Sequence, residues 1–368
     1  MNRAENDSSM VSRILSWQEF LSQYGTGWDD LCAASGSTGI MSTLSWRKSW
    51  YEVFCDSDKE RILVVEDDVG EFVGAVFMHF RRESIRAISS NVLYLWVNSH
   101  SHRQELLTAN ASVLANHLVE YLVSEKNTWD LARFQGIAND SGFSKAIQEA
   151  ASVIGMKAQK EREWVNNILT VTGNWEEYYR GLSTKGRQKG ERLGRRLAEI
   201  EDWHCRRYSS SEMMLAMQHY YTIESQSWKA EDGEVISESA KLRVYYDSLI
   251  ERLAERGQCQ AYILHLGEEP IAAVIALLYQ GCLSVYKTSF SEKYQKYSPG
   301  WLVYCELIRD AFQSDVAVVD LFGHTRHTKT WSKEELRFED LILFSPSLRG
   351  RMRAGGRWLI NKIRSRKA

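Results

Sequence analysis

The spacing of apolar residues along the chain alternates between two periods, and this alternation predicts an α/β protein. Runs with a period near 3.6 residues indicate helices, whereas short alternating or fully apolar runs indicate strands. In the first half, the pattern predicts helices at 14–34, 42–54, 104–124 and 141–151, and strands at 61–66, 71–80, 91–97 and 129–134. The sequence Asp-Asp-Val-Gly at 67–70 supplies a hairpin turn between the first two strands.

The second half repeats this alternation of helices and strands. The pattern predicts helices at 175–181, 184–200, 211–225, 238–256 and 301–312, and strands at 203–208, 260–266, 270–279, 282–289, 316–321 and 337–344. Tight turns at 267–269 and 280–281 join three of these strands into hairpins. The similar order of elements in the two halves indicates a divergent internal duplication, without a repeat at the level of single residues.

Composition and charge narrow the class of protein. The 368 residues suffice for two domains, and 44% of them are hydrophobic, so the chain can bury a core. Lys and Arg number 46 against 48 Asp and Glu, a balance that disfavours a globally basic nucleic-acid binder. The longest apolar run, Ile271–Tyr279, is too short to span a bilayer. Six cysteines without a CxxC pair, and a polar N-terminus, favour a cytoplasmic protein with reduced thiols.

The loop at 290–300 precedes the predicted helix at 301–312 and is the strongest candidate binding site. The start of a helix offers free backbone N–H groups and the positive end of the helix dipole, which together suit a diphosphate. Pro299 presets φ, Gly300 allows close approach of a ligand, and Ser298 is expected to cap the helix. Two nearby lysines add positive charge: Lys293 and Lys296. The alternative is an ordinary helix cap without a ligand.

The order of hairpin, strand, phosphate-binding loop, helix and strand is that of the GNAT acyltransferase fold. The chain resembles in particular the CelD-like and BioF2-like branch of this superfamily, which is related to FemAB-type proteins. The motifs that carry the resemblance are Trp46–Trp50, Ser183–Leu197, Glu224–Lys229, Tyr297–Gly300, Asp320–Gly323 and Lys329–Trp331. Together they span most of the chain.

This resemblance implies an α/β (α+β) fold with two GNAT-like domains in tandem, built from mixed, mostly antiparallel sheets flanked by helices. It implies a degenerate domain at 1–170, an acyltransferase domain with the donor site at 171–345, and a basic amphipathic tail at 346–368. The donor would be acyl-CoA or an acyl carrier protein, and no metal is implied. The usual donor loop, Gln/Arg-x-x-Gly-x-Gly/Ala, is replaced here by the segment 296–300, which leaves the donor open.

Acyl transfer to an amine requires a group that takes the amine proton and a group that supports the oxyanion and the leaving thiolate. Glu224 is the candidate base, because desolvation beside Trp228 would raise its pKa; a solvated helix-end glutamate is the alternative. Tyr286 is the candidate proton donor, with simple packing as the alternative. Strand alternation places Lys287 on the opposite face from Tyr286, so at most one of them is expected to point inward.

Asp320 lies at the end of a predicted strand, where it is expected to orient Lys329 or the acceptor amine. A structural ion pair is the alternative. His324 and His327 lack further ligands at metal-binding spacing and are interpreted as loop histidines. The other predicted contacts are Lys296, Tyr297, Ser298, Gly300 and Trp301 for the donor, and Arg187, Trp228, Lys229 and Trp331 for the substrate.

Two basic segments suggest anionic ligands. The segment 185–196 holds six basic residues and one acidic residue, and it is interpreted as a solvated face or as a site for donor phosphates or an anionic acceptor. The segment 349–367 holds eight basic residues, no acidic residue and interspersed apolar residues. It is expected to form a terminal helix docked on the protein, or a helix lying on an anionic membrane. Nucleic acid is disfavoured because aromatic residues do not interleave the charges.

Three functions remain open from the sequence. The first is a cytoplasmic N-acyltransferase acting on an amino sugar, a small amine or a peptide side chain, with peripheral contact at the inner membrane face through the tail. The second is a Fem-like peptidyl transferase that uses aminoacyl-tRNA. The third is a non-catalytic binding module in polysaccharide biosynthesis, because the altered donor loop is compatible with a degenerate site.

Overall fold

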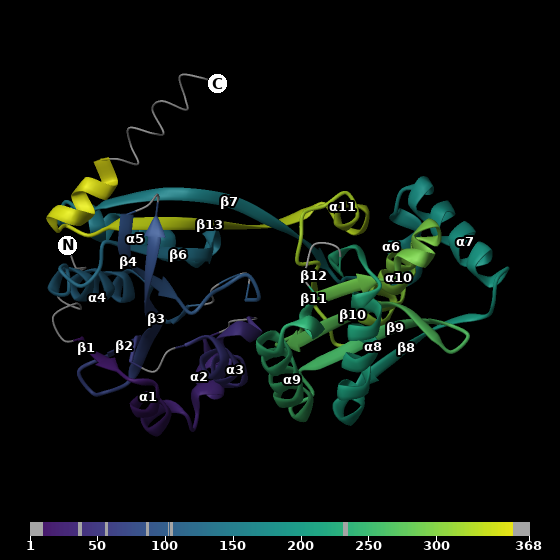
Figure 1. The fold of residues 1–368 in the computed structure, drawn as a ribbon, viewed down its shortest axis with the longest axis horizontal. Coiled ribbons are helices and arrows are strands. Elements are labelled where there is room, and N and C mark those ends of the chain that lie inside the picture. Colours follow the sequence, from purple (N-terminus) through teal and green to yellow (C-terminus); the bar gives the residue numbers. More distant parts are fainter. Residues whose placement is uncertain are drawn as a thin grey trace, which may run out of the picture. The chain divides into compact units, whose positions relative to one another are not determined.

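The computed structural model describes residues 10–35, 39–55, 58–85, 88–101, 103, 106–230 and 235–355. The chain forms two compact units (Figure 1). Unit 1 comprises Met1–Ser37, Met41–Trp164 and Arg337–Ala368, and unit 2 comprises Thr38–Ile40 and Val165–Leu336. Among the residues described, no helix is both long and apolar enough to cross a membrane.

Unit 1 is a mixed sheet with the strand order β1-β2-β3-β4-β6-β13. All neighbours in this order pair antiparallel except β4 and β6, which are parallel. Its elements are β1 (Val11–Leu15), α1 (Trp17–Tyr24), α2 (Trp28–Ala34), α3 (Leu44–Phe54), β2 (Glu60–Glu66), β3 (Phe72–Ile85), β4 (Ile88–Leu95), β5 (Leu107–Thr108), α4 (Ala111–Ser124), β6 (Leu131–Ala138) and α5 (Phe143–Val153). Helices α4 and α5 contribute to one apolar core with these strands.

Unit 2 has the strand order β7-β12-β11-β10-β9-β8, with β11 and β12 parallel. Its elements are α6 (Trp175–Gly181), α7 (Thr184–Ala198), β8 (Trp203–Ser209), α8 (Met213–Ser225), α9 (Ala240–Glu255), β9 (Cys259–Leu266), β10 (Glu269–Tyr279), β11 (Cys282–Phe290), α10 (Pro299–Ala311), β12 (Val318–Asp320) and α11 (Thr328–Trp331). Alternate residues of β10, Ala272, Val274 and Ala276, share a core with α10. The intervening residues are buried on the other face, which explains why β10 is apolar almost throughout.

Each unit is completed by a strand that comes from the other half of the sequence. Strand β7 (Lys157–Thr170) follows α5, yet its end pairs antiparallel with β12 in unit 2. Strand β13 (Glu334–Phe344) follows α11, yet it pairs antiparallel with β6 in unit 1. In both units an antiparallel meander is followed by a helix, a parallel strand and this exchanged strand. The tandem, mostly antiparallel fold expected from the sequence is thereby confirmed.

The first predicted helix, 14–34, is wrong as a single element. Ile14 belongs to strand β1, and the rest divides into α1 and α2. The division occurs at Gly25 and Gly27, and Gly27 has a φ of 95°, a conformation that glycine adopts at little cost. The pattern also gave no strand over 157–170, because β7 begins with charged and polar residues that lack an apolar alternation.

Helix α7 packs against α10 through Gly190. A Cβ atom at this position would lie 2.0 Å from two ring atoms of Trp301, whose indole also contacts Trp331 with ring centroids 4.9 Å apart. We expect Gly190→Ala to lower the free energy of unfolding by about 1–3 kcal/mol, because a buried indole must shift. Denaturant unfolding measures this change. Gly181→Ala is the matched control, since its Cβ meets nothing within 4 Å; equal losses in both variants would contradict the prediction.

Candidate functional site

Strands β11 and β12 of unit 2 are paired over only a short distance. Their parallel register comprises three residue pairs, ending at Ser284 and Asp320. Strand β12 ends there, whereas β11 continues to Phe290. Among the described residues, no strand pairs with β11 on the β12 side beyond Ser284, so this stretch of β11 can take an extended ligand beside it.

A β-bulge lies at the point where the two strands part. Lys287 of β11 pairs with Ile275 of β10, and Val285 pairs with Ala276, so Tyr286 is an extra residue in β11. The strict alternation assumed from the sequence does not hold across this bulge. Tyr286 and Lys287 are not separated, since the Lys287 ammonium lies 5.2 Å from the centroid of the Tyr286 ring.

Tyr286 belongs to a buried cluster of tyrosines. Its side chain is 4% exposed, and its ring centroid lies 5.9 Å from that of Tyr246 on α9. Burial, followed by the neighbouring Tyr245 and Tyr246, raises the pKa of Tyr286 well above its usual value. The phenol therefore stays protonated at neutral pH and can donate a hydrogen bond. Sequence reasoning missed Tyr245 and Tyr246, although adjacent tyrosines in an amphipathic helix are a visible signal.

Glu224, the predicted base, is buried at the end of α8. Its carboxylate accepts hydrogen bonds from the Tyr220 hydroxyl at 2.8 Å, the Ile236 amide at 2.9 Å and the Lys229 ammonium at 3.2 Å. Lys229 also donates to the backbone carbonyl of Thr288, 2.9 Å away, on the part of β11 beyond its pairing with β12. These contacts favour a positioning role, in which Glu224 holds an ammonium group against the β11 edge. The role of base stays a prediction.

Asp320, also predicted as catalytic, is buried where β12 ends. Its carboxylate accepts the Phe322 amide at 2.9 Å and the Asn166 side-chain amide at 3.3 Å. Phe322 has a φ of 51°, in the left-handed region that costs a bulky residue free energy. Asp320 thus stabilises the turn that leads the chain away from β11. Lys329, its expected partner, has an exposed side chain on α11.

The start of α10 presents an unpaired amide. Ser298 precedes the helix with a φ of 47°, and its side chain does not cap it; Pro299 is the first helical residue. The Trp301 amide donates to the Ser298 carbonyl at 2.9 Å. The Gly300 amide has no acceptor among the described residues. A Cβ on Gly300 would meet only Phe290, at 3.8 Å, so the glycine leaves room beside its own amide.

The corresponding helix of unit 1 begins differently. The side chain of Asn110 accepts the amides of Ser112 and Val113 at the start of α4, at 3.1 and 3.2 Å. These two N–H groups are satisfied by the protein itself and are not available to an anion. Of the two helices, α10 therefore has the better anion site.

The remaining predicted donor contacts divide into exposed and buried groups. Lys296 is exposed, with its ammonium 5.0 Å from the centroid of the buried Tyr297 ring. The Arg196 guanidinium of α7 lies 5.6 Å from the same centroid. Trp301 and Trp331 are core side chains, 5% and 1% exposed, so contact of their rings with a ligand stays a prediction that their burial disfavours.

The predicted substrate contacts lie on two elements. Arg187 is half-buried on α7, and its buried Nε has no hydrogen-bond partner among the described residues. Trp228 is 47% exposed after α8, so it does not bury the neighbouring Glu224 as expected. Lys229 joins Glu224 to β11 as described above. The structure thus brings Glu224 and Lys229 to the same strand edge as Tyr286.

The loop histidines give no sign of a metal centre. His327 packs edge-on against Tyr304, with ring centroids 4.6 Å apart. Burial, assisted by the charge of Lys189, lowers the pKa of His327 to about 4, so the imidazole is neutral at pH 7. Within the described part of the chain, no group of three or more His, Cys, Asp or Glu side chains is arranged to hold a metal ion.

Residues 184–330 match the family model described as an acetyltransferase (GNAT) domain. This segment is similar to GNAT domains. It includes the parting strands, the bulge and the start of α10, and the family assignment supports acyl transfer as the general activity. No protein of curated function matches the chain significantly.

Several solved structures share the fold around the GNAT domain. FemX has a TM-score of 0.58 at 11% identity, with 86% of this chain and 95% of that chain covered. L-PGS from Bacillus licheniformis has a TM-score of 0.51 at 12% identity, covering 88% and 93%. The C-terminal domain of a putative lysylphosphatidylglycerol synthetase from Agrobacterium fabrum has a TM-score of 0.51 at 8% identity, covering 87% and 91%. At these identities the likeness concerns the fold alone.

Proposed function

We propose that the GNAT domain transfers an acyl group from acyl-CoA to the amine of an amino sugar, a small amine or a peptide side chain. The observation that carries this proposal is the parting of β11 and β12 beside the unpaired Gly300 amide. The stretch of β11 at 285–290, beyond its pairing with β12, suits an extended thioester arm. The Gly300 amide and the dipole of α10 suit the diphosphate at the other end of the same donor.

The proposed chemistry uses groups at this edge. The acceptor amine attacks the thioester carbonyl carbon, the carbon–sulfur bond breaks, and the sulfur leaves as a thiolate. The phenol of Tyr286, which burial keeps protonated, is proposed to donate its proton to that thiolate, while water takes the proton from the amine and passes it on to restore the phenol. Lys229, held by Glu224, is proposed to stabilise the negative charge that develops on the carbonyl oxygen.

Aminoacyl-tRNA is a second candidate donor, favoured by the surface of α7. Four exposed cations follow one another at intervals of four, three and four residues, which places them on one face of the helix: Lys185, Lys189, Arg192 and Arg196. The last of these lies against Tyr297, three residues before Gly300. A basic stripe leading to the donor loop suits a polyphosphate, and resemblance to Fem-type proteins implies a tRNA donor. An acyl carrier protein remains a third source of the thioester.

A donor panel separates these possibilities. The purified protein is incubated with acyl-CoAs of different length and an amine mixture, and a thiol reagent reports released coenzyme. We expect release above the background of hydrolysis with at least one donor. If no coenzyme is released, if coenzyme does not protect the protein from unfolding, and if the protein retains tRNA, aminoacyl-tRNA is favoured as the donor. If acyl-CoA, acyl carrier protein and tRNA all fail to bind, the proposed function is wrong and a binding module is favoured.

A further inference from the structure

The end of the described chain forms a helix whose two large apolar side chains are exposed. Residues 348–355 are helical and follow β13. Leu348 and Met352 are 77% and 70% exposed, although apolar residues on a docked helix normally face the protein. They are four residues apart, so both lie on the same face of the helix.

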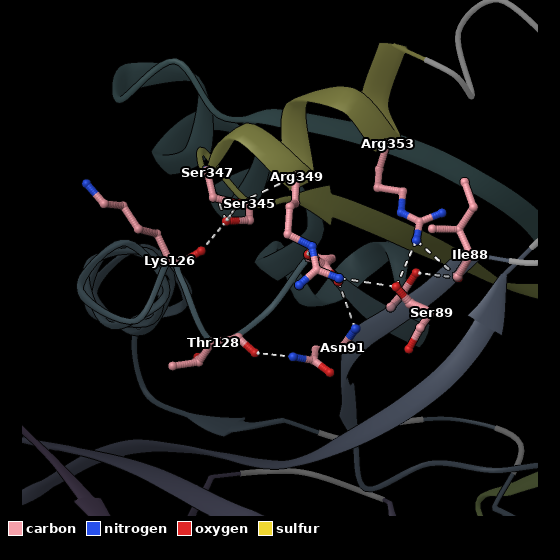
Figure 2. Close-up of polar contacts among 12 residues, drawn as sticks. Ile88, Ser89, Asn91, Lys126, Thr128, Ser345, Ser347, Arg349 and Arg353 are labelled. Atoms are coloured by element: carbon pink, nitrogen blue, oxygen red, sulfur yellow. Dashed lines mark hydrogen bonds and ion pairs between the residues drawn. The ribbon is translucent and has the colours of Figure 1, made fainter.

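Arginines hold this helix to unit 1, as Figure 2 shows. Arg349 forms an ion pair with the buried Asp130 at 3.3 Å. Arg353 donates to the carbonyls of Ile88 and Ser89, each at 3.1 Å. The described part of the predicted tail is therefore docked through its arginines and through the small Ala354, which packs with Tyr94 and Ile342, whereas the larger apolar side chains stay exposed. Residues 356–368 of the tail lie outside the described residues.

Further exposed apolar side chains lie on the elements that meet this helix. Val153 and Ile154, at the end of α5, are 86% and 46% exposed. Ile88, whose carbonyl binds Arg353, is 59% exposed. A cavity of about 220 Å³ connects the end of α5 to the helix: its lining includes Gly155, Met156, Lys157, Pro346, Arg351 and Ala354. These five exposed apolar residues, Ile88, Val153, Ile154, Leu348 and Met352, are called the apolar end of unit 1.

Exposed cations lie beside the apolar end. Lys157 and Arg351 line the cavity and are exposed. The described residues from 345 to 355 contain three arginines and no Asp or Glu. Asp130, the acidic group that meets the helix through Arg349, is neutralised by that ion pair.

We propose that the apolar end of unit 1 binds the surface of a membrane that contains anionic lipids. Apolar side chains that protrude beside cations match the boundary between acyl chains and anionic headgroups. A second copy of the chain fits less well, because a two-fold interface would oppose the same positive segment to itself. Nucleic acid also fits less well, since the outermost groups on the helix are apolar and two of its arginines bind backbone carbonyls and Asp130.

Vesicle co-sedimentation of the full chain tests this proposal. Vesicles of phosphatidylcholine alone are compared with vesicles that also contain phosphatidylglycerol, and no acyl donor is added. We expect binding to the anionic vesicles only. The affinity of the double variant Leu348→Glu, Met352→Glu for anionic vesicles is expected to fall at least about tenfold, because two apolar groups are lost from the lipid contact. Binding needs no turnover, so its failure would leave the proposed reaction untouched.

A matched double variant is the control. Val69 and Val244 are 77% and 60% exposed, on the turn between β2 and β3 and on α9, and neither belongs to the apolar end. Val69→Glu, Val244→Glu adds the same charge and should bind vesicles like the unaltered chain. The proposal fails if the unaltered chain ignores anionic vesicles or if both doubles lose binding equally. It also fails if light scattering shows a dimer of the unaltered chain that only Leu348→Glu, Met352→Glu abolishes. The same holds if the unaltered chain binds RNA and only this double variant loses that binding.

Discussion

Replacing Gly300 by leucine is expected to raise the KM for the acyl donor about tenfold or more, a loss of about 1.4 kcal/mol or more. The Gly300 amide is unpaired at the start of α10, and an added side chain would occupy the space beside it. The variant should still fold, because the first atom of the new side chain meets only Phe290 at 3.8 Å. Steady-state kinetics with varied donor and saturating amine measure the change.

Gly181→Leu provides the control for this experiment. Gly181 ends α6, and an added Cβ there also meets nothing within 4 Å. Its KM should equal that of the unaltered protein, and thermal melting should show both variants folded. A donor KM that is the same in Gly300→Leu and the unaltered protein would mean that the diphosphate does not bind at α10.

Replacing Glu224 by glutamine is expected to lower both kcat and stability while leaving the donor KM nearly unchanged. The buried carboxylate accepts three hydrogen bonds, and the Lys229 ammonium would lose its acidic partner. We expect a loss of about 1–3 kcal/mol in the free energy of unfolding. Without its partner, Lys229 would be held less firmly against the Thr288 carbonyl. Denaturant unfolding and steady-state kinetics measure the two effects.

The pH dependence of kcat distinguishes the two roles of Glu224. If the carboxylate is the base, Glu224→Gln removes the limb of the pH–rate profile that reports its ionisation. If it only positions Lys229, the profile keeps its shape at a lower height. Glu212→Gln, at an exposed ion pair with Arg206 just before α8, is the control and should change neither kcat nor stability appreciably. A Glu224→Gln variant with unaltered stability and kcat would exclude both roles.

Local patterns in the sequence predict most of the helices and hairpins because those elements are set by neighbouring residues. The helix at 42–54 corresponds to α3 with Thr43 as its cap, and the strands at 260–289 correspond to β9, β10 and β11. Strand β7 could not be predicted in the same way. Its first six residues are mostly charged or polar, and its end pairs with β12, about 150 residues away.

Local sequence patterns predict the candidate site only in part, as they do the fold. The loop before α10 is visible in the sequence, since Pro299 and Gly300 mark the start of a helix. The bulge at Tyr286 is not visible, because it depends on the register of β11 against β10. The hydrogen bond from Lys229 to Thr288 also requires the folded chain, as it joins residues 59 positions apart. Residue types were therefore predictable, whereas their mutual orientation was not.

The strand exchange between β7 and β13 has a consequence for how this protein can be divided. A fragment ending near residue 170 would keep β7 but lack the strand that pairs with β6, and the complementary fragment would lack the strand that pairs with β12. Each fragment would expose the backbone of a sheet edge that is covered in the intact chain. We therefore expect neither half to fold well alone, so that a split of the gene between the two parts would require both products to be made together.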